Sequence, residues 1–336
     1  MENRLSRAII DAIVRNSVKQ IKKDPERNIR KVIDMALSLS NGRFQKHFLE
    51  TAQTMLEEET SCYYKIIPDL IANVDEERIV TVGMNIGYNS CSLGAQTIRE
   101  IEAREHFNIP WSVFLEMDKR SFKRHRKHYH SALSQGKELG IYTWTINASD
   151  NPYYTLELAE AFPEYTFLIL CSPENITPAL LDDAKNINNV VFIVEYTEAT
   201  SEACNLLRSQ KHLFSVFYKL TDSYLEPTLL DEILSDTENL NALFTIFSSD
   251  NSSLEDGIPF YEHIQQIRSE QKYRTIPFDF LRDNCYIDSI ISEQVCAISF
   301  FKNGTCHSLD KHIVLENCNL FHNSLSNILK VVSSKN

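Results

Sequence analysis

Glycine is scarce in this chain, and the glycines that it has do not form a phosphate-binding fingerprint. Only 8 of the 336 residues are glycine. Gly83, Gly87 and Gly94 surround Cys91 in the segment "RIVTVGMNIGYNSCSLGA", but their spacing differs from the GxGxxG of a dinucleotide-binding turn. An open doubly wound sheet is therefore our second choice for the architecture. Because Gly87 lies between a predicted strand and a predicted helix, we expect it to adopt a positive φ.

Long apolar runs and paired cysteines are also missing. No stretch approaches the roughly 18 consecutive apolar residues of a membrane span. Charges recur through the first residues, which therefore lack the apolar core of a signal peptide. The 8 cysteines form no CxxC pair, so we expect free thiols in a reducing compartment and place the protein in the cytoplasm.

Positive charge is in the minority, since the net charge is −12. This acidity excludes general nucleic-acid binding. Residues 1–47 nevertheless hold eleven Lys and Arg against five Asp and Glu, which predicts contact with an acidic surface on a partner or on the rest of this chain. Residues 118–130 hold six Lys and Arg and three His; we interpret them as a solvated helix face, with a phosphate or nucleic-acid patch as the alternative.

What is present divides the chain into three parts. Apolar residues recur at helical spacing through residues 1–75, which we expect to form an α-helical N-terminal module. From residue 78 onward, short apolar runs alternate with helical stretches, as in a parallel sheet covered by helices. The predicted strands are residues 79–85, 111–117, 141–147, 166–172, 190–196, 213–219, 243–249 and 273–280. The predicted fold is therefore α/β, a whole or partial (β/α) TIM-like barrel over residues 76–283.

Residues 284–336 have a different character and form the predicted C-terminal tail. "VCAISFFKNGTCHSL" contains Asn303 and Gly304, the dipeptide most typical of a tight β-hairpin. "FHNSLSNILKVV" follows it and predicts a short closing helix.

This order of parts resembles the radical S-adenosylmethionine (radical SAM) superfamily over residues 78–330. The fragments that carry the resemblance are "GKELGIYTWTINAS", "TFLILCSPENIT" and "NNVVFIVEYTE", together with the tail "CAISFFKNGTCHSL…FHNSLSNILK". The tail is similar to the SPASM-type extension of peptide-modifying members. The resemblance implies a barrel, an S-adenosylmethionine (SAM) site, an iron–sulfur cluster and a peptide substrate.

The cluster motif of that family is absent from this sequence. Three thiolates in a CxxxCxxC loop after the first strand hold the [4Fe–4S] cluster in radical SAM proteins, whereas "GYNSCSLGAQTIRE" offers only Cys91. The Gly-Gly-Glu that would hold SAM is reduced to Glu116 in "FLEMD". We therefore interpret Cys91 as part of a vestigial loop and expect no cofactor. An iron–sulfur cluster with SAM is the alternative.

Barrel active sites lie at the carboxyl ends of strands. The residues predicted there are Asn85, Glu116, Asp118, Asn147, Cys171, Glu195, Lys219 and Asp279. Glu116 with Glu195 or Lys219 is the candidate acid–base set, and a mouth of ordinary solvated charges is the alternative.

The tail also offers a second candidate metal site. Cys285, Cys296, Cys306 and Cys318 lie close enough in sequence to meet around iron–sulfur or zinc. Because the set lacks a closely spaced pair, we interpret these cysteines as buried free thiols and keep the metal site as the alternative.

Two hypotheses for function follow. The first is a non-catalytic accessory that offers a cluster-less barrel to a peptide or protein partner, in peptide maturation. The second is an enzyme, either a radical SAM-type protein that modifies a peptide or a cofactor-free barrel enzyme that uses Glu116 and Glu195.

Overall fold

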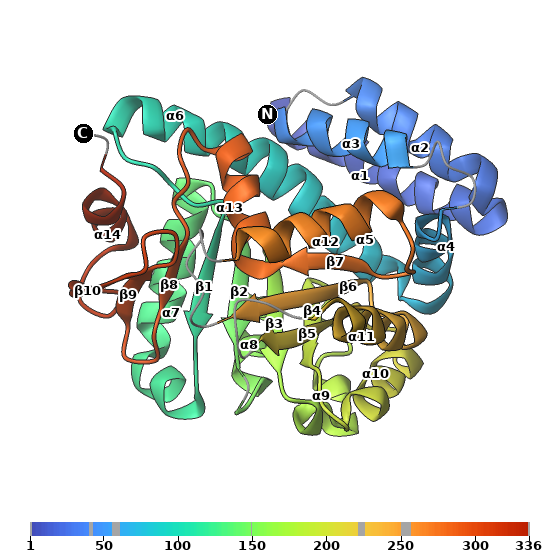
Figure 1. Cartoon of the computed structure of the whole chain (residues 1–336). Coiled ribbons are helices and arrows are strands. Elements are labelled where there is room, and N and C mark those ends of the chain that lie inside the picture. The colour runs from blue at the N-terminus through green and yellow to red at the C-terminus, as the bar shows by residue number, and fades with distance from the viewer. Residues whose placement is uncertain are drawn as a thin grey trace.

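The fold is built around one ten-stranded sheet (Figure 1). The computed structural model describes residues 2–39, 43–55, 61–148, 150–220, 226–249 and 257–334. Seven consecutive strands pair in parallel: β1 (Ser112–Glu116), β2 (Thr143–Asn147), β3 (Thr166–Cys171), β4 (Val190–Glu195), β5 (Phe214–Leu220), β6 (Phe244–Ser249) and β7 (Ile276–Asp279). β8 (Ile298–Phe300) pairs in parallel with β1 on the other side, and β9 (Thr305–Ser308) and β10 (Ile313–Asn319) continue antiparallel.

Helices connect these strands and extend the chain at both ends. The first group is α1 (Glu2–Lys23), α2 (Pro25–Leu39), α3 (Arg43–Met55), α4 (Tyr63–Asn73), α5 (Glu76–Met84), the π-helix η1 (Asn85–Gly94) and α6 (Ala95–Glu105). The second group is α7 (Lys119–Leu139), α8 (Tyr153–Ala161), the 3₁₀ turn η2 (Pro173–Asn175), α9 (Pro178–Asp183), α10 (Thr200–Ser209), α11 (Pro227–Asn239), α12 (Ile258–Glu270), α13 (Phe280–Ile291) and α14 (Leu325–Val332). None of the described helices is both long and apolar enough to cross a bilayer.

The sheet curves into a partial TIM-like barrel, which confirms the predicted fold class. Phe114 on β1 and Phe280 at the start of α13 meet edge to face, with ring centroids 5.6 Å apart. Both belong to one apolar cluster with Leu170, Ile193 and Ile246 from the middle strands. A flat sheet would keep β1 and β7 apart, so this shared cluster requires curvature. The described strands do not close the ring, because β7 ends the sheet without pairing with β8.

Helices α4 and α5 and the π-helix η1 cover the amino-terminal end of the barrel. Arg78 of α5 donates to the carbonyl oxygens of Ala184, Lys185 and Ile187 and contacts Nδ1 of His212 at 2.7 Å. The basic α1 reaches the acidic start of α5, where Lys22 pairs with Glu76 at 2.9 Å and Arg15 pairs with Glu77. The basic segment therefore contacts acidic side chains of its own chain.

The segment 79–85, predicted as a strand, is a helix. Asp75 caps α5 by accepting hydrogen bonds from the backbone N–H groups of Glu77 and Arg78, and two glutamates occupy the positive end of the helix. Val80 packs against the α1–α2 helices while Val82 packs toward the barrel, so both sides are apolar and the run shows no clear period. A short buried run of this kind does not distinguish helix from strand by periodicity.

Residues from the tail extend the same sheet. The predicted hairpin is confirmed, because β8 and β9 pair through Asn303 and Gly304, which has a φ of +84°. The predicted closing helix is α14, and β10 was not predicted. Phe321, just after β10, stacks on His125 of α7 with ring centroids 3.8 Å apart. The limits at residues 75 and 283 stay predictions.

Candidate functional site

Three of the predicted site residues share the inner face of the barrel at its carboxyl end. Side chains alternate along a strand, and Phe114, Ile193 and Phe217 all point into the inner apolar cluster. Two residues further on, Glu116, Glu195 and Lys219 therefore face the same side. Glu116 is in register with Asn147 of β2, and Lys219 is in register with Ser248 of β6. The three candidate acid–base residues thus lie on one face at the same end of the sheet, on β1, β4 and β5.

An aromatic floor lies beneath this charged rim. Its members are half-buried and come from β1, β5, β6, β7 and the first turn of α13: Phe114, Phe217, Phe244, Phe278 and Phe280. Sequence reasoning missed the floor, because an apolar run in a buried strand does not show which of its residues face the inside. A half-buried apolar surface below a few polar groups is the usual composition of a ligand site.

A cavity opens beside the floor, between β1 and α13. It is lined by Ser112, Phe114, Thr145, Asn284 and Asp288 among others. The Asp288 carboxylate accepts hydrogen bonds from the backbone N–H groups of Trp111 at 2.8 Å and Cys296 at 3.2 Å. Complete burial raises the pKa of Asp288 well above its ordinary value. No motif marks Asp288 in the sequence, so it is not among the predicted site residues.

Four other residues predicted at the mouth have structural roles: two cap helices, one lies in the core and one lies at the opposite end of the barrel. Asp118 caps α7 through the backbone N–H of Ser121 at 2.7 Å, and this hydrogen bond lowers the pKa of Asp118. Asp279 caps α13, and burial raises its pKa. Cys171 belongs to the core between the sheet and its outer helices. Asn85 lies at the opposite end of the barrel, because residues 79–85 are not a strand; its side-chain amide donates to the carbonyl oxygens of Pro163 and Tyr165.

The cysteines do not form the ligand set of a cluster at this mouth. Cys91 is buried within the π-helix η1 and not in a loop after a strand, and burial raises its pKa to about 12. The loop that does follow the first strand, at residues 117–118, holds no cysteine.

The four cysteines of the tail are not brought together around a metal. Cys285 lies on α13, Cys306 on β9 and Cys318 on β10, while Cys296 precedes β8. All are buried free thiols, and burial raises the pKa of Cys285 and Cys306 to about 12. Within the described ranges, no three or more His, Cys, Asp and Glu side chains are arranged to hold a metal ion.

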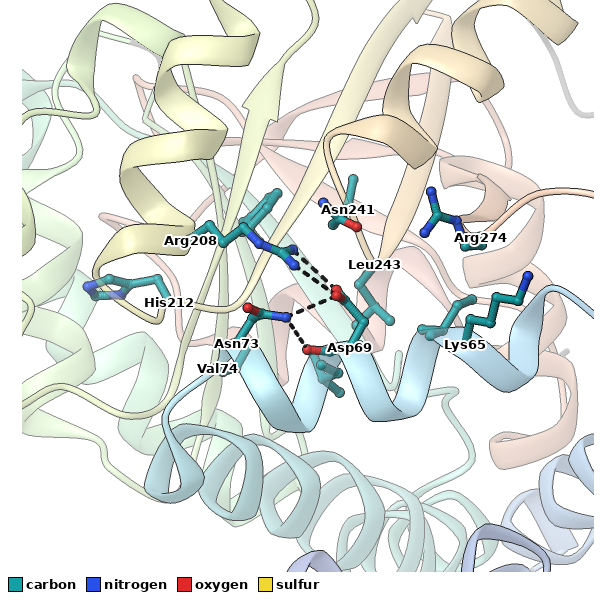
Figure 2. A pocket seen from close by; sticks show the side chains of 13 residues that line it. Lys65, Asp69, Asn73, Val74, Arg208, His212, Asn241, Leu243 and Arg274 are labelled. Atoms are coloured by element: carbon teal, nitrogen blue, oxygen red, sulfur yellow. Dashed lines mark hydrogen bonds and ion pairs between the residues drawn. The ribbon is translucent and has the colours of Figure 1, made fainter. Parts of the chain in front are cut away.

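A second hollow lies at the opposite, amino-terminal end of the barrel (Figure 2). Asp69 of α4 forms a two-pronged ion pair with Arg208 of α10, at 2.8 and 3.2 Å, and also accepts from Asn73 at 2.9 Å. Lys65 and Arg274 stand on the far side of the same hollow. Because Asp69 engages Arg208, this pair joins α4 to the barrel.

The fold is similar to that of SuiB from Streptococcus suis. The SuiB structure bound to precursor peptide SuiA has a TM-score of 0.51 and 9% identity, covering 68% of this chain and 66% of that chain. The structure of SuiB alone has a TM-score of 0.50 and 9% identity, and the match covers 73% of this chain and 71% of that chain. The structure of SuiB bound to S-adenosylmethionine has a TM-score of 0.49 and 8% identity, and the match covers 68% of this chain and 66% of that chain. Two of these comparisons thus span slightly less than two thirds of SuiB. No protein-family model and no curated protein matches the sequence.

These comparisons show an α/β fold like that of SuiB, and they correct one expectation. We expected no cofactor, but SuiB has been solved with S-adenosylmethionine bound. The expectation took the missing CxxxCxxC motif as evidence against any cofactor, whereas a SAM site also consists of polar and apolar contacts to the molecule itself. The described cysteines do not fit a cluster of the CxxxCxxC type.

Proposed function

We propose that this protein binds a peptide across the mouth of its barrel and takes part in peptide maturation. The observation that carries the proposal is the aromatic floor beneath a rim that holds Glu116, Glu195 and Lys219. Half-buried phenylalanines suit an apolar peptide side chain, and the rim charges suit the polar groups of the backbone beside it. The fold supports the same setting, since SuiB has been solved with a precursor peptide.

The finer points of the proposal concern the cofactor site and the tail. We propose that the barrel has a degenerate cluster site, of which Cys91 is not a part, and that residues 284–336 form a SPASM-like tail. The lack of a cysteine in the loop after β1 supports the first proposal, and the β8–β9 hairpin with the closing helix α14 supports the second. We also propose a cytoplasmic location, which the eight free cysteines support.

Selection from a phage-displayed library of random peptides tests peptide binding at the mouth. The wild-type protein should enrich peptides that the Lys219→Glu variant does not bind, since Lys219 is an exposed rim residue. Lys211→Glu is the matched control, because Lys211 is also exposed but lies ahead of β5, at the opposite end of the strand. Equal enrichment by the wild type and Lys219→Glu would contradict the proposal.

Anaerobic purification tests the degenerate cluster site. We expect a protein without the visible absorption of an iron–sulfur cluster. Bound iron that is lost in Cys91→Ala would refute the proposal. Calorimetric titration with SAM, run on the same sample, measures whether the molecule binds without such a cluster.

A peptide-modifying enzyme is the second candidate function. It is favoured by the common inner face of Glu116, Glu195 and Lys219, which offers an acid–base set. If it is correct, Glu116→Gln and Glu195→Gln should abolish conversion of a selected peptide, as seen by mass spectrometry, while peptide affinity is retained. A selected peptide whose mass the wild-type protein leaves unchanged, with and without SAM, would instead favour the binding function.

A further inference from the structure

Strand β10 leaves one end of the sheet open to solvent. The opposite end, β7, packs against α12 and α13. In β10, Ile313 is 51% exposed and Val314 is 43% exposed. None of the described strands pairs with the outer side of β10. An uncovered edge strand presents backbone groups that can pair with another extended chain.

The hydrogen-bond pattern shows which backbone groups point outward. Phe301 donates to Thr305 and Leu309 donates to Ala297, so the odd-numbered residues of this hairpin form its ladder bonds. Bonding alternates along an antiparallel strand, and Cys306 and Ser308 therefore bond β10 through their register partners. Those partners are Leu315 and Ile313. The N–H and C=O of Val314 must then face away from β9, toward solvent.

Basic groups lie beside the far end of this edge, beyond the exposed Glu316 of β10. Phe321 follows β10 and stacks on His125 of α7. Arg124, the residue before His125, and His128, about one turn after it, are exposed on α7, and the exposed His322 follows Phe321. These cationic and imidazole groups stand out on a chain whose net charge is −12. β10 runs in the same direction as β8 and β1, so its basic end lies toward the mouth of the barrel.

We propose that the outer edge of β10 pairs with an extended, acidic segment of the peptide that the mouth binds. The outward N–H and C=O of Val314 recognise an extended backbone, and the α7 side chains recognise carboxylates that follow the paired segment. Three strand spacings of ~4.8 Å separate β10 from β1, and a peptide paired with the outer edge of β10 lies one spacing further out, about 19 Å from β1. That the partner is a peptide rests on the proposed peptide-binding function.

Fluorescence anisotropy with a labelled peptide of alternating valine and glutamate tests the pairing. The Val314→Pro variant removes the outward N–H while leaving the Ile313 and Leu315 bonds to β9, and it should weaken binding about tenfold. Val314→Thr keeps that N–H and serves as the matched control with unchanged affinity. Arg124→Glu should weaken binding and flatten its salt dependence.

A second probe keeps the proposal falsifiable if Val314→Pro does not fold. The same peptide, N-methylated at alternate residues, cannot pair, so it should bind wild-type protein about tenfold more weakly. Equal affinity of the two peptides, or no binding of the unmethylated peptide, would overturn the proposal. Wild-type dimers that Val314→Pro converts to monomers would also overturn it, because a second copy would then occupy the edge. If Lys219→Glu loses peptide binding and Val314→Pro does not, pairing with β10 is refuted while peptide binding at the mouth of the barrel is supported.

Discussion

Gly94 and Gly87 lie in the same π-helix, but only one of them requires the absence of a side chain. A Cβ on Gly94 would approach the carbonyl oxygen of Gly140 to 2.3 Å, whereas a Cβ on Gly87 would meet no atom within 4 Å. Gly87 does not have the expected positive φ; among the described glycines, Gly140 and Gly304 do. The expectation was wrong because it assumed a strand-to-helix turn at Gly87.

Alanine substitutions should therefore separate the two glycines. We expect Gly94→Ala to lower the free energy of unfolding by about 1–3 kcal/mol, since an added methyl group in a packed contact forces the backbone to shift. Gly87→Ala should raise it by up to about 1 kcal/mol, because alanine loses less backbone entropy in a helix. Urea unfolding of the two variants measures both changes, and equal effects would contradict the assignment.

His212 links stability to pH. Burial and the nearby Arg78 lower its pKa to about 3, while an unfolded histidine titrates near pH ~6.5. Between these values the unfolded chain binds one more proton than the folded protein. The stabilisation is thus complete above pH ~6.5 and is lost as the pH falls, by about 1.4 kcal/mol per pH unit.

Replacing the His212 imidazole should remove its contribution to the pH dependence of the unfolding free energy. We expect His212→Gln to flatten the dependence of the unfolding free energy on pH between ~4 and ~6.5 by about one proton. His128→Gln, at an exposed position of α7, is the control that should keep the wild-type slope. Chemical denaturation at a series of pH values gives the comparison; parallel curves for His212→Gln and wild type would contradict it.

Helix α4 is joined to α10 by the Asp69–Arg208 ion pair, and a double-mutant cycle measures its strength. The side chains are 37% and 28% exposed, so solvent screens the pair. We expect a coupling energy of about 0.5–1 kcal/mol from Asp69→Ala, Arg208→Ala and the double variant, with a smaller value at high salt. Strictly additive single effects would show that the pair does not join the two helices.

Secondary structure was predictable wherever apolar patterning agreed with local turn chemistry. Strands β1–β7 are runs of buried residues separated by helices with caps such as Asp118 and Thr177. α13 escaped prediction because Asp279 ends β7 and caps α13 at once, without an intervening turn. β10 escaped because most of its residues are exposed on both faces, and an edge strand of this kind lacks alternation.

The site was predictable in part for the same physical reason. Glu116, Glu195 and Lys219 each end a recognisable strand run, and parallel strands bring their carboxyl ends together. The floor contributed by Phe278 and Phe280 depends on how the sheet curves, which a linear pattern does not encode. Their roles in binding stay predictions.

At the scale of the whole molecule, Asp288 connects the segments that lead into the paired strands β1 and β8. Its carboxylate holds Trp111, just before β1, and Cys296, just before β8. We expect Asp288→Ala to lower the free energy of unfolding by about 2–4 kcal/mol, because two buried N–H groups lose their acceptor. Asp288→Asn retains one acceptor oxygen and should cost less. Urea unfolding measures both, and an alanine variant as stable as wild type would contradict this role.

The parallel pairing of β1 with β8 also has a consequence for synthesis on the ribosome. Val113 pairs with Ile298, so β1 leaves the exit tunnel long before its neighbour has been translated. Throughout that interval one edge of β1, the strand that contains the half-buried Phe114, lacks its partner, while the other edge pairs with β2. Chains released prematurely, before residue 298, keep that edge, and such edges attract chaperones and promote aggregation. Synthesis of β8 therefore decides whether this edge of β1 is protected.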